Sequence, residues 1–97
     1  MYQLRIRRIA RQDVQDAVDY YDSFNPKVTD RFLDKLYAEF DTITSNPYLF
    51  QVKYRDTRVR YLQGFPFGIH YIIDGEMIEV LAVLHTSRNQ QDWQRKR

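Results

Sequence analysis

The stretch FGIHYIIDGEMIEVLAVL, residues 67–84, contains the clearest local signal in the chain, because Asp74-Gly75 interrupts two runs of β-prone residues. Asp-Gly is a favoured two-residue hairpin loop, since both central positions of a type I′ turn require a positive φ. With Asp74-Gly75 as the loop, the large apolar residues of one parity fall on one face of the hairpin. The predicted register pairs Ile73 with Glu76, Tyr71 with Ile78, Ile69 with Val80, Phe67 with Ala82, Ile72 with Met77 and His70 with Glu79.

Two further segments have the alternation of strands. Residues 52–62, VKYRDTRVRYL, are β-prone and place Arg58 and Arg60 on the opposite parity from Val59 and Tyr61. They predict one strand with a basic outer face. The segment 2–7, YQLRIR, alternates apolar residues with arginine and predicts a half-buried first strand.

The segments between these strands have helical periodicity. Apolar residues spaced i, i+3, i+4 and i+7 predict a first helix over about residues 10–23, with Asp13 and Asp16 in early turns, where a negative charge suits the helix dipole. A second helix is predicted to begin after Asn25-Pro26, with the asparagine as its cap, and to end near Asn46, which precedes a proline. The short link between the helices predicts an antiparallel helical hairpin.

The element order is therefore β-α-α-β-β-β, which predicts an α+β fold: an antiparallel-rich twisted sheet with the helical hairpin packed on one face. A chain of 97 residues suits one domain, 1–97, and we expect residues 89–97 to form a frayed basic tail. The formal charge of +2 is unevenly distributed: residues 1–11 carry +4, residues 12–50 carry −5 and residues 51–97 carry +3.

Composition also excludes several classes of protein. The chain has no cysteine, which rules out a disulfide framework or a thiolate metal site and favours a reducing, cytoplasmic location. Its longest purely apolar run, 80–84, is far shorter than the ~20 residues that span a bilayer, so no membrane partner is expected. The two histidines lie about 20 Å apart in the predicted register, so they cannot share a metal ion.

Several short motifs occur together in one known family. They are Asp13 with AVDYY at 17–21, RFL at 31–33, Asn46-Pro47, RYLQGFPFGIHYIID at 60–74, VLAVLH at 80–85, and then Arg88 and Trp93. On these residues the chain resembles the RelE/ParE toxins of bacterial type II toxin–antitoxin systems, also described as plasmid-stabilisation proteins, and the ParE-like branch in particular. The resemblance implies a growth-arresting toxin without a cofactor, neutralised by a cognate antitoxin in a hetero-oligomer.

The resemblance leaves the target open. RelE-like members are ribosome-dependent mRNA endoribonucleases that use no metal, whereas ParE-like members poison DNA gyrase. A third alternative is a non-toxic member that retains only antitoxin binding. Because members of one fold differ in function, the site residues have to distinguish these alternatives.

The nuclease residues of RelE-like members are only partly kept. The resemblance places Arg58 and Arg60 at the positions of two lysines, Gly68 at or near an arginine, Ser87 or Arg88 at a second arginine, and Trp93 at a tyrosine. Arginine stays protonated and an indole does not titrate, so proton transfer would need another group. His85 could supply it, although a histidine at a strand end can equally hydrogen-bond the adjoining loop. The tentative catalytic set is therefore Arg58, Arg60, His85 and Arg88, and the balance is against an enzyme.

A binding role is the alternative for the same residues. We expect Arg58, Arg60, Tyr61, Arg88 and Trp93 to contact the target or the antitoxin, either through phosphate or through acidic side chains. An ordinary solvated face is the competing interpretation of the basic segment, which also contains Lys53, Arg55 and Tyr54. Arg5 and Arg7 would extend this surface if the first strand were adjacent to it. Tyr20, Tyr37 and Tyr48 could line a groove for an antitoxin helix.

Overall fold

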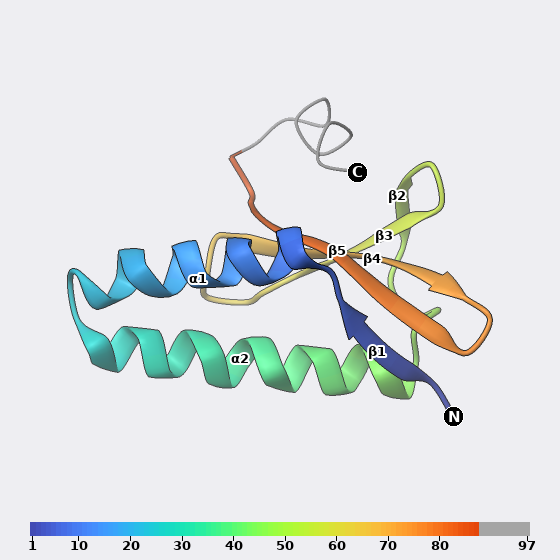
Figure 1. Ribbon diagram of the computed structural model, residues 1–97, viewed down its shortest axis with the longest axis horizontal. Coiled ribbons are helices and arrows are strands. Elements are labelled where there is room, and N and C mark those ends of the chain that lie inside the picture. Colours follow the sequence, from blue (N-terminus) through green and yellow to red (C-terminus); the bar gives the residue numbers. More distant parts are fainter. Residues whose placement is uncertain (88–97) are drawn as a thin grey trace.

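The computed structural model describes residues 1–87, and Arg88, Trp93 and the tail predicted at 89–97 lie outside the described residues. The elements are β1 (Gln3–Ile6), α1 (Arg8–Asp22), α2 (Pro26–Ser45), β2 (Val52–Tyr54), β3 (Thr57–Tyr61), β4 (Phe67–Asp74) and β5 (Met77–His85). They form one sheet in the order β1-β5-β4-β3-β2, with β1 parallel to β5 and the other pairs antiparallel (Figure 1). The predicted α+β class and helical hairpin are confirmed, with five strands in place of four.

The starts of the two helices can be compared with the capping residues that the sequence predicted. The side chain of Asn25 accepts a hydrogen bond from the backbone N–H of Lys27 at 3.0 Å, and Pro26 is the first residue of α2. This is the predicted cap, because a side-chain oxygen at this position satisfies one of the free amides of the first turn. Helix α1 begins at Arg8, earlier than predicted, so its first turn contains no acid. The prediction that Asp13 serves the helix dipole is wrong, because this residue lies deeper in the helix and is buried.

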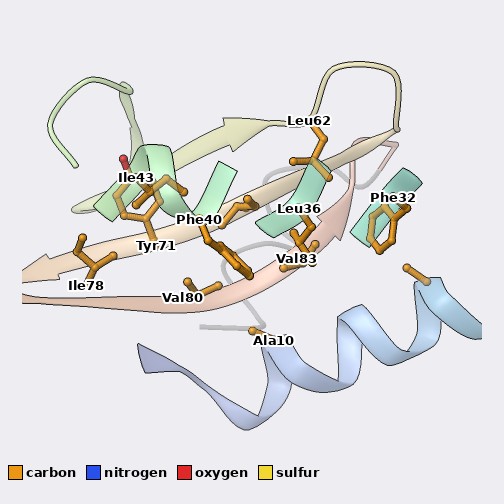
Figure 2. Close-up of a cluster of buried hydrophobic side chains, with 12 residues drawn as sticks. Ala10, Phe32, Leu36, Phe40, Ile43, Leu62, Tyr71, Ile78, Val80 and Val83 are labelled. Atoms are coloured by element: carbon orange, nitrogen blue, oxygen red, sulfur yellow. The ribbon is translucent and has the colours of Figure 1, made fainter. Parts of the chain in front are cut away.

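The hydrophobic core lies between the helical hairpin and one face of the sheet (Figure 2). Its buried side chains include Ala10 from α1, Phe32, Leu36, Phe40 and Ile43 from α2, and Ile69, Tyr71, Ile78, Val80 and Val83 from β4 and β5. Within residues 1–87, no helix has both the length and the apolar content needed to cross a bilayer.

The hairpin between β4 and β5 has a different loop from the predicted one. Asp74 pairs with Met77, so the loop residues are Gly75 and Glu76, and among them only Gly75 has a positive φ, of 60°. A type II′ turn needs a positive φ only at its first central position, which glycine supplies while the aspartate stays in the strand. Tyr71 therefore pairs with Val80 and not with Ile78.

A β-bulge then changes the parity of β5. The pairing passes from Tyr71 with Val80 to His70 with Ala82, so one residue of β5 is left over between them. As a result Val83, and not Ala82, joins the core. The predicted cross-strand pair of His70 with Glu79 is wrong because the loop at Gly75-Glu76 shifts the register by one residue and sets Ile72 opposite the glutamate.

The single strand predicted over residues 52–62 is two strands joined by a tight turn. Arg55, in that turn, has a φ of 48°, which is unusual for a residue other than glycine. Arg55-Asp56 has a turn-prone aspartate but no glycine or asparagine at the positive-φ position, so the signal for a reversal here was weak. The two outer strands, β1 and β2, occupy opposite edges of the sheet. Arg5 and Arg7 therefore do not extend the basic segment of residues 53–60, contrary to the conditional expectation.

Candidate functional site

Arg60 lies on the face of β3 that meets the helices. It pairs across the sheet with Ile69, a core residue, and its guanidinium bonds the carboxylate of Glu39 on α2. The side chain of Glu39 is only 6% exposed, and its Oε1 also forms an ion pair with Nζ of Lys35 at 3.7 Å. The Arg60 guanidinium in addition lies over the ring of Phe50, 4.6 Å from its centre. The interpretation of a basic outer face on this strand is therefore wrong.

Arg58 lies on the same face and holds the loop that follows α2. Its Nη1 donates a hydrogen bond to the carbonyl oxygen of Phe50 at 2.6 Å, and its guanidinium lies 5.0 Å from the ring centre of Tyr48. From β4, the buried hydroxyl of Tyr71 donates to the carbonyl oxygen of Pro47 at 2.6 Å. We call Glu39, Arg58 and Arg60 the latch, because together they tie this loop and α2 to the sheet.

The latch limits the chemistry that these arginines can perform. Both guanidiniums already contact a carboxylate, a carbonyl or a ring. Arginine also stays protonated, so neither residue can act as a general acid or base. Tyr61 lies on the opposite face, where its ring packs so closely on Gly68 that a Cβ there would come within 3.2 Å of it.

A groove of about 540 Å³ runs between α1 and the last residues of β5. It exists because β1 pairs with β5 only as far as Val80, after which α1 takes the place of a neighbouring strand. Asp13 spans the gap: its Oδ2 accepts a hydrogen bond from the backbone N–H of Val83 at 3.0 Å. The groove is lined by Asp13, Asp16, Ala17, Tyr20, Tyr21, Pro66, Phe67, Val83, Leu84 and His85.

His85 stands at the mouth of this groove and is hydrogen-bonded to the adjoining loop. Its Nδ1 accepts from the backbone N–H of Ser87 at 3.1 Å, and its ring meets that of Phe67 edge to face at 5.4 Å. The anticipated hydrogen bond to the adjoining loop is therefore present, and a role for His85 in proton transfer stays a prediction.

His70 is buried on the other side of the sheet. Its Nδ1 is 3.1 Å from the hydroxyl of Tyr54, and burial lowers the pKa of the imidazole to about 4. Burial likewise raises the pKa of Tyr71 to about 12. Both groups are therefore neutral at physiological pH. Residues 1–87 contain no cluster of three or more His, Asp or Glu side chains arranged to hold a metal ion.

The arrangement of strands, helices and groove can now be compared with known proteins. A family model described as the ParE toxin of type II toxin–antitoxin systems, parDE, matches residues 4–90. The chain is a member of the ParE toxin family. Its role is accordingly that of a type II toxin, and its partner is an antitoxin.

A solved structure agrees with this ParE-family fold. It is titled as the chromosomal ParDE toxin–antitoxin system from P. aeruginosa, and it superposes with a TM-score of 0.77 at 18% identity, covering 88% of this chain and 96% of that one. At this identity the likeness is one of fold. A search of curated proteins found no match.

The buried structural roles of two charged residues of this ParE-family toxin, Asp13 and Glu39, were not foreseen from the sequence. Each carried a usable signal, because each is an acid at a core position of a helical stripe. Glu39 belongs to the spacing of Phe32 and Leu36, and Asp13 to that of Ala10 and Ala17. A carboxylate at such a position is buried and must find a partner, but the sequence does not say which one.

Proposed function

We propose that this toxin arrests growth by binding and poisoning DNA gyrase, with no chemistry of its own. The observation that carries the proposal is the latch. The two arginines that stand at the catalytic lysine positions of RelE-like nucleases are tied to Glu39 and to the loop after α2. What remains for target recognition is shape, charge and apolar surface, which suits a poison that acts by binding. The proposed target places the toxin in the cytoplasm of the cell that produces it.

The test measures both candidate targets in the same cells. After induction of the toxin without its antitoxin, we expect plasmid supercoiling to change and cleaved DNA to accumulate on gyrase, while transcripts stay intact. Purified toxin at micromolar concentration should inhibit supercoiling by purified gyrase. Cuts in mRNA at translated codons, lost in His85→Ala, would instead establish the ribosome-dependent nuclease. Normal growth on induction would leave a member that only binds an antitoxin.

We also propose that the antitoxin docks in the groove beside α1. An amphipathic helix binds by placing its apolar face in a hydrophobic groove. Here Ala17, Tyr21 and Leu84 supply apolar walls, and Tyr20, 58% exposed, stands at the rim. The Tyr20 ring packs edge to face on Phe24 at 4.8 Å, which extends the apolar surface toward the end of α1.

Tyr20→Ala should weaken antitoxin binding by about 10–30-fold, the effect expected of a tyrosine anchor worth about 1.4–2 kcal/mol. Titration calorimetry with the purified antitoxin measures the change. Tyr37→Ala is the matched control, because this tyrosine is 57% exposed on α2 but lies outside the groove. Equal losses in the two variants would contradict docking in the groove.

A further inference from the structure

Four exposed arginines lie together where β1 passes into α1, and neither the latch nor the groove uses them. We call Arg5, Arg7, Arg8 and Arg11 the N-terminal patch. Figure 1 shows this junction beside β5, at the opposite end of the helical hairpin from the start of α2. Residues 1–11 contain these four arginines and no acid, so the segment carries four positive side-chain charges.

Contacts with the neighbouring backbone and with β5 hold the patch in place. The carboxylate of Glu79 on β5 forms ion pairs with Nη1 of Arg5 at 3.6 Å and with Nη2 of Arg7 at 3.2 Å. The side chain of Glu79 is only 14% exposed. The Nε of Arg11 donates to the carbonyl oxygen of Ile6 at 3.2 Å, which folds this side chain back toward β1. Three of the four guanidiniums are therefore partly ordered before any ligand arrives, which lowers the entropy lost on binding.

The charge of the patch is largely uncompensated. In the described part of the chain, Glu79 is the carboxylate that forms ion pairs within 4.0 Å of these arginines. One carboxylate between four guanidiniums leaves an excess of three positive charges. The side chains of Arg5 and Arg7 are still 63% and 43% exposed, so their ion pairs do not cover them. The latch differs, because there the guanidiniums are turned inward.

The side chains next to these arginines indicate which class of partner the N-terminal patch suits: single-stranded nucleic acid, protein or duplex DNA. Residues 3–11 contain no aromatic side chain, whereas proteins that bind single-stranded nucleic acid stack bases on aromatic rings. Protein interfaces have apolar cores that are depleted in charge, and here Ile9 is the one large apolar side chain of residues 3–11 that is exposed. Clustered guanidiniums without rings or an apolar centre match the phosphates of a duplex, which present charge alone to a surface contact.

We propose that the N-terminal patch binds the phosphate backbone of duplex DNA without sequence preference. The contact would add to gyrase poisoning by placing the toxin against the DNA that the enzyme holds. It does not depend on that proposal, because binding of DNA by the free toxin is measured without gyrase. Measurement of DNA binding by the free toxin therefore tests the patch alone.

The test titrates full-length toxin, freed of its antitoxin, into a fluorescein-labelled 20-base-pair duplex at several salt concentrations. Each phosphate contact contributes about −0.9 to the slope of log K against log salt. Arg8→Ala should therefore make the slope shallower by about 1, and Arg8→Ala combined with Arg11→Ala by about 2. Arg8→Glu with Arg11→Glu should weaken binding at least tenfold at low salt. Circular dichroism checks that each variant is folded.

The matched control reverses the same number of charges elsewhere. Lys27→Glu with Arg31→Glu alters two exposed cations near the start of α2 and should change the affinity less than threefold. Equal losses in the two pairs would mean that net charge alone governs binding and would overturn the proposal. So would an unchanged slope in Arg8→Ala, or tighter binding of a single strand of equal length. Loss of antitoxin binding in the patch variants, with DNA affinity intact, would assign the patch to a protein partner and also overturn it.

Discussion

In urea unfolding, Glu39→Leu is expected to lower the free energy of unfolding of this ParE-family toxin by about 2–3 kcal/mol. Removing one partner of a buried ion pair typically costs about 3–5 kcal/mol, because the other charge stays buried without compensation. The Arg60 side chain is still 26% exposed, so hydration partly replaces the lost carboxylate and the expected cost falls below that range. The change should appear in the midpoint of the urea transition, with an unchanged m-value.

A double substitution distinguishes the cost of leaving a buried charge unpaired from the cost of lost side-chain packing. Glu39→Leu combined with Arg60→Leu removes both charges, and replacing a buried pair by apolar groups is often neutral or stabilising. The double variant should therefore recover most of the stability lost in the single one. Lys35→Ala removes the more exposed partner of the same carboxylate, at 3.7 Å, and should cost less than 1 kcal/mol. A single variant as stable as the parent would contradict the role of the latch.

The second large effect is a loss of stability in mild acid caused by His70. Burial lowers the pKa of this imidazole from 6.5 to about 4 in the folded state. The unfolded chain therefore binds a proton at a higher pH than the folded chain. Stability is full above about pH 6.5 and falls as the pH is lowered toward 4. A difference of about 2.5 units corresponds to roughly 3 kcal/mol between these limits.

His70→Gln tests this assignment because it removes the titrating ring but retains a polar side chain near the Tyr54 hydroxyl. The variant should be less stable at pH 7, and its stability should depend less on pH between 6.5 and 4. Thermal unfolding measured across this range gives both quantities. His85→Gln is the control, because His85 is exposed at the end of β5. If the pH dependence is the same in the parent and in His70→Gln, other groups cause it.

The register of the hairpin between β4 and β5 was predicted only in part from the sequence. Parity alone predicted correctly that Ile69, Tyr71, Ile78 and Val80 share the core face. The loop was misplaced by one residue, because Asp-Gly also permits a turn in which only the glycine needs a positive φ. The bulge before Ala82 has no local signature, so the placement of Val83 on the face under the helices and of Ala82 on the opposite face could not be foreseen.

The candidate site was predicted in its residue types more than in its geometry. Arg58 and Arg60 were recognised as an important pair, and a binding role for them stays a prediction. Their orientation was wrong, because alternation gives two faces but does not say which one a helix covers. The burial of Glu39 on α2 decides this, since it supplies the carboxylate that Arg60 needs on that face.

The sequence by itself determined the α+β class, the two helices with the cap at Asn25, and the resemblance to RelE/ParE toxins. These depend on local periodicity, on capping and on short motifs, all of which act over a few residues. Tertiary structure decided which partner each charge has. Glu39 meets Arg60, Glu79 gathers Arg5 and Arg7, and Asp13 completes the edge of β5. These partners are far apart in the chain, and only the order and register of the strands bring them together.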